Sequence, residues 1–226
     1  MREGAADAAA GRVRAHALPL VLLVGLVVSV AIFVVVAAAY VDGGTVVDLD
    51  LRVESWVVAN MPAWAEWLAR PFTWAGGAIG ITLVSAAAVI TLERCRRRVD
   101  AVLVIVVAAG AFLLTTGLKQ VYERARPDAG SAIRLPHSYS FPSGHAATGI
   151  AVFGLLAVLL AERSRTRHAG VLWLLCGFSL GAAVGVSRVV LNVHFVSDVI
   201  AGFCVGLAWL CACLLVRELA VPHAAE

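Results

Sequence analysis

Long apolar stretches separated by short polar segments make up most of this chain. Six such stretches are bounded by charged and turn residues, and each is close to the roughly 17 to 25 residues that a helix needs to cross a bilayer core. The pattern predicts an all-α fold, an integral membrane protein built as a six-helix bundle. The six stretches are residues 18–40, 73–92, 101–118, 144–161, 170–186 and 195–216.

The first stretch follows a basic N-terminal segment, and in this it resembles a signal peptide. Its 23 residues exceed the 7 to 15, roughly, of a signal core, so we predict an uncleaved first span. The second stretch contains Gly76 and Gly77, and the fifth is short, yet arginines bound both of them on one side. We therefore keep both as predicted spans.

Composition supports a membrane protein and argues against a nucleic-acid-binding one. Hydrophobic residues make up 61% of the 226 residues, the mean hydropathy is +0.90, and charged residues make up only 15%, against roughly 25% in a soluble domain. The net charge of +3 is too small, and the arginines are too scattered, for a nucleic-acid surface. The five cysteines have neither the spacing of a disulfide framework nor that of a zinc site. We expect the lipid bilayer as a partner and no nucleic acid.

The distribution of basic residues predicts the orientation of the bundle. With the N-terminus inside, the cytoplasmic segments carry eleven basic residues and the outer segments carry seven. Cytoplasmic loops are enriched in Lys and Arg, so both termini are predicted to be cytoplasmic in a multi-pass protein of the plasma membrane. A single domain would cover residues 18–217, between cytoplasmic tails at 1–17 and 218–226. A short interfacial segment is predicted in the first outer loop from its tryptophans, Trp56, Trp64, Trp67 and Trp74.

Four segments with unusual polar residues are predicted to meet at the outer face. In an up-and-down bundle of six, the third span ends, the fourth begins, the fifth ends and the sixth begins on the same side. The four segments fall at these points, so residues far apart in sequence would share one mouth. They are Lys119–Pro127, Phe141–His145, Ser187–Arg188 and His194–Asp198.

Three cations in these segments predict a phosphate site. At the bilayer centre Lys, Arg or Asp costs about 2.5 to 3.5 kcal/mol each, so a wet pocket near the interface suits them better. Lys119, Arg126 and Arg188 around one point would attract a dianion. The first free N–H groups of the fourth span, around Ser143 and Gly144, would point at the same anion, and the absence of a Cβ on Gly144 lets it approach closely.

Two histidines in the same segments predict the reaction. His194 and Asp198 lie four residues apart on one helix face, so the carboxylate can accept the Nδ1 proton and leave Nε2 as an oriented nucleophile. His145 has no acid at that spacing and lies beside the cations, a setting that suits a proton donor to a leaving alcohol. The residues predict attack of His194 on phosphorus, protonation of the departing oxygen by His145, and hydrolysis of the phosphohistidine by water that His145 activates.

These residues form three blocks with fixed internal spacing: K-x6-R-P at residues 119–127, P-S-G-H at 142–145 and S-R-x5-H-x3-D at 187–198. Together they resemble the signature of the type-2 phosphatidate phosphatase family, the metal-independent lipid phosphatases related to vanadium haloperoxidases. The resemblance implies a helical bundle and a phosphohistidine mechanism with His194 as nucleophile, His145 as acid and Asp198 as the partner of His194. It implies no metal and no cofactor. The phosphate ligands that it implies are Lys119, Arg126, Ser143, Gly144 and Arg188.

Other polar residues of the chain have plainer interpretations. Arg124 and Arg134 lie in the third-span loop but are not fixed residues of the blocks, and we expect them to be solvated or to face lipid headgroups. The segment "VVDLDLR" at residues 46–52 contains the D-x-D pattern of another phosphatase class, but no soluble doubly wound pattern follows it. His137 precedes the second block, and contact with substrate is one hypothesis for it. Taken alone, a His with an i+4 Asp could be a structural pair or part of a proton path.

The sequence thus predicts a membrane lipid phosphatase that removes a terminal phosphate at the outer face of the plasma membrane. Phosphatidate, phosphatidylglycerophosphate, diacylglycerol pyrophosphate and polyprenyl pyrophosphate all satisfy the charge requirement. A phosphotransferase of the same family is one alternative, and an ion or proton transporter is another. Transporters of that kind usually show spans broken near mid-membrane, whereas the charges here are predicted at span ends. The oligomeric state stays open.

Overall fold

The structure, a computed structural model, describes residues 2–127, 133 and 138–220, with side chains from residue 17 onward. The described part contains eight α-helices and no β-strand. The helices are α1 (Arg2–Val41), α2 (Thr45–Asn60), α3 (Ala63–Ala75), α4 (Ala78–Arg94), α5 (Arg98–Tyr122), α6 (Gly144–Ala161), α7 (Arg167–Val190) and α8 (Val196–Ala220).

The helices have the length and apolarity of a multi-pass membrane protein. Five of them can cross a bilayer, namely α1 from Ala17 onward, α5, α6, α7 and α8. The pair α3 and α4 passes the same test together but bends by 50° at its break, so it makes a sixth span only if the two count as one. The all-α membrane fold is confirmed, and the count of six spans stays a prediction.

The second predicted stretch, 73–92, is divided between two helices. It begins in the last turn of α3, is interrupted at Gly76 and Gly77, and continues in α4. At the interruption the chain packs closely on α7, because a Cβ on Gly76 would lie 2.0 Å from Cγ1 of Val184. The segment predicted as the first outer loop is itself helical and forms α2 and most of α3. Its four tryptophans are exposed, as an interfacial role requires: Trp56, Trp64, Trp67 and Trp74.

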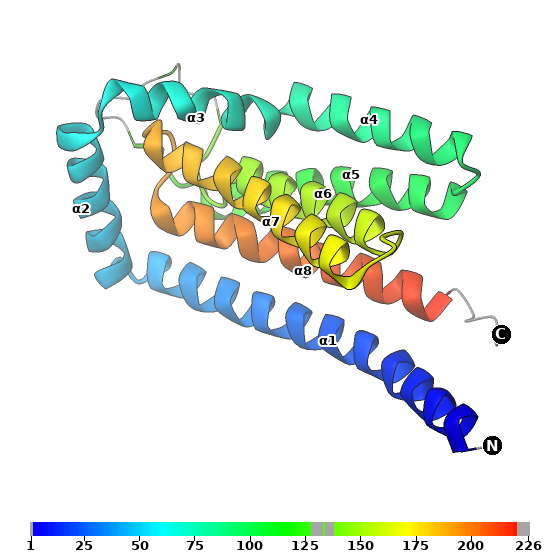
Figure 1. The fold of residues 1–226 in the computed structure, drawn as a ribbon. Helices are drawn as coiled ribbons and strands as arrows, with labels where there is room; N and C mark the ends of the chain where they lie inside the picture. Colours follow the sequence, from blue (N-terminus) through cyan, green and yellow to red (C-terminus); the bar gives the residue numbers. More distant parts are fainter. Residues whose placement is uncertain (1, 128–132, 134–137, 221–226) are drawn as a thin grey trace.

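Helix α6 lies at the centre of the bundle. It contacts α4, α5, α7 and α8, and 67% of its 18-residue apolar window is buried, against 11% in α1, which packs on α8 (Figure 1). Two glycines of α8 let that helix approach the backbone of α6. A Cβ would lie 2.4 Å from the carbonyl oxygen of Ser143 at Gly202, and 2.3 Å from that of Ala147 at Gly206. The spacing of two charged segments, the starts of α6 and α8, therefore depends on these two close contacts.

The four polar segments lie at one end of the bundle, opposite the start of α1 and the end of α8 (Figure 1). The start of α1 and the end of α8 lie at one end, and α2 crosses the other end (Figure 1). The end of α5, the start of α6, the end of α7 and the start of α8 lie at the same end as α2. This is the juxtaposition that the alternation of spans predicts for the four polar segments.

We expect Gly206→Ala to destabilise the protein. The added methyl group would meet the Ala147 carbonyl oxygen of α6, and overpacking of this kind costs about 1 to 3 kcal/mol. Thermal unfolding of the purified protein in detergent measures the change. The matched control is Gly117→Ala on α5, where no atom lies within 4 Å of the new Cβ and where alanine favours the helix. Equal stability of the two variants would contradict the role given to the α6–α8 contact.

Candidate active site

A cavity of about 860 Å³ opens between α4, α5 and α6 and carries two kinds of lining. At the end of the bundle near α2 and α3 its wall is polar and basic. Farther along α4 and α5 it is mostly apolar, with Ile81, Val89, Ile105 and Phe112 among the lining side chains. Of the predicted site residues, six line the polar part: Lys119, Arg126, Gly144, His145, Arg188 and His194.

His194 lies in the short turn between α7 and α8 and has only 3% of its surface exposed. Its Nδ1 lies 3.4 Å from Oδ2 of Asp198, and its Nε2 lies 3.0 Å from Nη1 of Arg126. A guanidinium can only donate, so Nε2 accepts this hydrogen bond and the ring proton is on Nδ1. Burial, and then the charges of Arg126, Arg188 and Lys119, lower the pKa of His194 well below its usual range. The imidazole is therefore neutral, with its basic nitrogen facing the cations.

Asp198 lies behind His194 in the first turn of α8 and has no exposed surface. Its Oδ2 accepts the backbone N–H of Phe195 at 3.0 Å in addition to facing Nδ1 of His194. Its backbone oxygen accepts the N–H of Ser143 at 2.9 Å, which ties the start of α8 to the start of α6. The carboxylate does not line the cavity, and its position suits orientation of the imidazole.

The three predicted phosphate-binding cations reach the cavity from three separate segments. Lys119, in the last turn of α5, donates to the carbonyl oxygens of Tyr139 and Ser140. Arg126 donates to the carbonyl oxygen of Val193 at 2.8 Å as well as to His194. These contacts hold two positive charges beside the unprotonated Nε2.

Arg188, near the end of α7, is the most buried of the three cations, with 2% of its surface exposed. Its Nη1 donates to Oγ1 of Thr73 in α3. Its Nε is buried and has no hydrogen-bond partner among the described residues. A buried charged donor without a partner is costly, so an anionic oxygen at this point would stabilise the site.

The start of α6 brings the P-S-G-H block to the cavity, but only some residues of the block line it. Gly144 and His145 line the cavity, and the α3–α4 break lies beside His145, since a Cβ on Gly77 would be 3.5 Å from Nε2. Ser143 is fully buried, does not line the cavity and caps α6 by accepting the Ala146 N–H at 3.5 Å. Its contact with phosphate stays a prediction.

The prediction for Arg124 is wrong. We expected a solvated side chain, but only 6% of Arg124 is exposed, and its guanidinium bridges two carboxylates. Nη1 donates to Oδ1 of Asp198 and Nη2 donates to Oδ2 of Asp50, each at 2.7 Å. The physical reason is that α2, whose helical fold the sequence reasoning missed, brings the buried Asp50 to this loop. A spacing of 74 residues between each pair of partners gives no local signal in the sequence.

The remaining sequence hypotheses are settled only in part. Arg134 and His137 lie outside the described residues. Within residues 2–127, 133 and 138–220, no group of three His, Cys, Asp or Glu side chains could hold a metal ion. The five cysteines are free, in agreement with the absence of a disulfide pattern.

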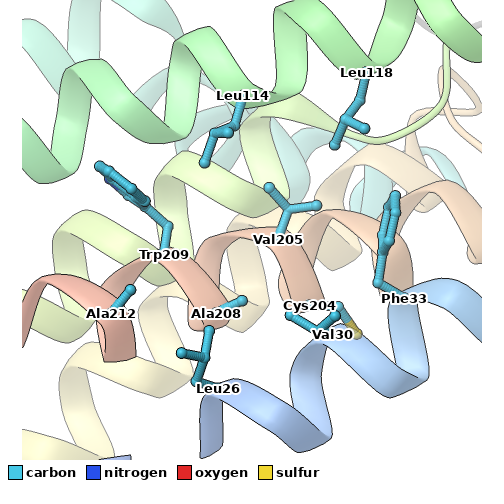
Figure 2. Close-up of a pocket in the computed structure, with 10 residues that line it drawn as sticks. All are labelled: Leu26, Val30, Phe33, Leu114, Leu118, Cys204, Val205, Ala208, Trp209 and Ala212. Atoms are coloured by element: carbon cyan, nitrogen blue, oxygen red, sulfur yellow. The ribbon is translucent and has the colours of Figure 1, made fainter. Parts of the chain in front are cut away.

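A second groove, of about 220 Å³, lies between α1, α5 and α8 and has a different character. Figure 2 shows its lining, in which all ten side chains are apolar. It has no ionisable side chain other than the thiol of Cys204, so it cannot perform the acid–base chemistry that the first cavity allows. The first cavity is therefore the candidate active site.

Comparisons with known proteins show the family to which the chain belongs. The chain is 29% identical to phosphatidylglycerophosphatase B of Bacillus subtilis (strain 168) over 182 residues, which cover 80% of this chain and 89% of that protein. It is 34% identical to a lipid A 1-phosphatase of Porphyromonas gingivalis over 89 residues, 39% of this chain and 17% of that protein. The crystal structure of a transmembrane PAP2-type phosphatidylglycerolphosphate phosphatase from Bacillus subtilis superposes with a TM-score of 0.82 at 26% identity, and covers 88% of this chain and 98% of that one. Residues 100–221, which include all three motif blocks and more than half of the chain, match the PAP2 superfamily, and the chain belongs to that superfamily.

Proposed function

We propose that this protein is a membrane lipid phosphatase that hydrolyses the terminal phosphate of a phospholipid through a phosphohistidine on His194. One observation carries the proposal. The neutral His194, held by Asp198 at Nδ1, presents Nε2 to a cluster of cations where the large cavity changes from polar to apolar. A lipid phosphate has the same division into a charged head and an apolar tail.

In the first step, Nε2 of His194 attacks phosphorus and the bond from phosphorus to the lipid oxygen breaks. His145 gives its proton to the departing oxygen, so this oxygen leaves as a neutral hydroxyl group of the lipid. A bound phosphate dianion offsets the cations around His145 and thereby favours its protonated form before the step. Asp198 stabilises the positive charge that develops on the His194 ring.

In the second step, a water molecule gives a proton to His145 and attacks the phosphorus of the phosphohistidine. The P–N bond breaks, inorganic phosphate leaves, and His194 returns to its neutral form. Lys119, Arg126 and Arg188 hold the phosphoryl oxygens through both steps, with the unpartnered Nε of Arg188 among the donors. Gly144 lets the start of α6 approach the same oxygens.

The apolar part of the cavity is the proposed place for an acyl chain. It follows α4 and α5 away from the cations, and small lining side chains such as those of Ala86 and Ala109 leave room for the chain. Among the candidate substrates we favour phosphatidylglycerophosphate, because the relative that matches most of the chain has the corresponding activity in its name. The distribution of basic residues supports cytoplasmic termini, and hence a site on the outer face of the plasma membrane.

His194→Ala should lower phosphate release from lipid substrate by about 10³-fold or more, since the variant has no nucleophile.

His145→Asn should impair the two steps of the reaction unequally. With an aryl phosphate, whose leaving group needs no proton, it should still form the phosphoenzyme but hydrolyse it slowly. Labelling with ³²P-phosphate esters measures both, and the label should be acid-labile. Labelled protein in the His194→Ala variant would reject the assignment of the nucleophile.

Activity should survive removal of divalent metal ions. Three side-chain cations already surround the proposed phosphate position and supply the charge that a metal would otherwise provide. Phosphate release in detergent is measured before and after dialysis against EDTA, with and without added Mg²⁺. A loss of activity that Mg²⁺ restores would point to a different mechanism.

Ala109→Phe should selectively impair turnover of long-chain lipid phosphates. Ala109 lines the apolar part of the cavity on α5 and is exposed, so the ring fills the cavity without repacking the core. We expect a rise in KM of about tenfold for diacyl substrates, since a few buried methylene groups contribute roughly 0.8 kcal/mol each, and little change for a water-soluble aryl phosphate. Leu114→Phe, on the opposite side of the same helix, is the control. Equal effects of the two variants would place the acyl chain elsewhere.

A further inference from the structure

Asp198 is held from behind by a buried network whose other members, Arg124, Ser197 and Asp50, are not fixed residues of the family signature. We propose that Arg124 and Asp50 are positioning residues, which keep Asp198 ionised and aimed at Nδ1 of His194 and thereby fix the reactive tautomer of the proposed nucleophile. The proposal rests on the proposed function of the site. It adds Asp50 from α2 and Arg124 from the loop after α5 to the residues that serve the proposed reaction.

The geometry around Arg124 is specific on every side. Its Nη1 donates to Oδ1 of Asp198 and to Oγ of Ser197, and its Nη2 donates to Oδ2 of Asp50, all at 2.7 Å. The planar guanidinium is also covered by two rings, with its carbon 4.5 Å from the ring centroid of Tyr40 and 4.2 Å from that of Phe195. Such an arrangement leaves the side chain one orientation.

Asp50 anchors the far side of the network. It has 2% of its surface exposed and accepts the backbone N–H of Ser197 at 3.0 Å as well as the Ser197 hydroxyl. It therefore binds both Arg124 and the first turn of α8, which also carries Asp198. Asp50 lies outside residues 100–221, which match the superfamily.

The charges give Arg124 a role beyond packing. Asp50, Arg124 and Asp198 together carry one net negative charge, and the guanidinium lies between the two carboxylates. Without it, two buried carboxylates would face each other across Ser197, and one of them would bind a proton. A protonated Asp198 no longer requires the proton of His194 on Nδ1, so the tautomer would lose its remaining support once a bound phosphate draws Arg126 away from Nε2.

Neither Arg124 nor Asp50 lines the cavity. Their loss should therefore slow the chemical step and leave phosphate binding nearly intact. This separates them from Arg126 and Arg188, which line the cavity and whose loss should raise KM.

The test uses Arg124→Gln, Arg124→Lys, Asp50→Asn and the double variant Asp50→Asn with Arg124→Gln in the full-length protein. We expect Arg124→Gln to lower kcat by about 100-fold with KM within about threefold, and Arg124→Lys to retain more of the activity. Removing the second carboxylate relieves the unpaired charge, so the double variant should be about tenfold more active than Arg124→Gln alone. Controls are Asp48→Asn and Arg52→Gln, exposed neighbours of Asp50 on α2, which should match the wild type.

Two outcomes would overturn the proposal. A double variant no more active than Arg124→Gln would mean that Arg124 serves folding alone, as would an equal rise of KM in place of the fall in kcat. An independent readout is ¹⁵N NMR of the His194 ring, assigned with His194→Ala and recorded in an Arg126→Ala background, where no guanidinium donates to Nε2. It should show a proton on Nδ1 when Arg124 is present and a mixture of tautomers when Arg124→Gln is added. That spectrum tests the network even if no lipid phosphate is hydrolysed, so failure of the proposed function is distinguishable from failure of this inference.

Discussion

The proposed mechanism depends on one carboxylate that must stay charged although burial removes it from solvent. Asp198 has no exposed surface, and an isolated carboxylate there would bind a proton to escape the cost of desolvation. The fold replaces the lost water with the Phe195 N–H and the Arg124 guanidinium, and the imidazole of His194 faces the remaining side. Because the carboxylate is satisfied by donors on one side, it can orient the ring on the other. In the proposed mechanism the cations of the cavity bind the phosphate, and the Asp198 arrangement favours the ring tautomer that presents Nε2 to it.

The same carboxylate is tied to the packing of the bundle. The backbone oxygen of Asp198 accepts the Ser143 N–H at the start of α6. Two glycines of α8, Gly202 and Gly206, bring the same helix against the backbone of α6. Small residues at such contacts let helices approach closely in a membrane, where the hydrophobic effect gives little drive for association. The distance between His194 and His145 is therefore set by backbone contacts, which deform less than long side chains.

The sequence predicts those features of the structure that depend on residues close together in the chain, and it misses those that depend on long-range packing. Apolar runs are local, and they predicted the all-α membrane fold and placed α6 at its observed bounds, 144–161. The alternation of spans then predicted that Lys119, His145, Arg188 and His194 share one end. The break at Gly76 and Gly77 depends on packing against α7, so the pattern of 73–92 could not place it.

Long-range pairs leave no trace in a single sequence. Arg124 is two residues from Arg126, and both are arginines in one loop, yet one faces a cavity and the other two buried carboxylates. What separates them is α2, a helix with four charged residues in a segment that the sequence predicts as part of a loop. Within its D-x-D pattern Asp50 is buried and Asp48 is exposed. Only the folded position of α2 distinguishes these two aspartates, so the network was beyond sequence reasoning.

The contact between Arg126 and His194 has a consequence for the order of events. The guanidinium donates to the lone pair of Nε2, the pair that the proposed mechanism needs for attack on phosphorus. A phosphate oxygen carries more negative charge than a neutral imidazole nitrogen and offers Arg126 a stronger, charge-assisted acceptor. Binding of the phosphate would therefore turn Arg126 from the ring to the ligand and release the lone pair in the same movement. In this arrangement the group that occupies the lone pair of the proposed nucleophile becomes one of those that stabilise the transition state.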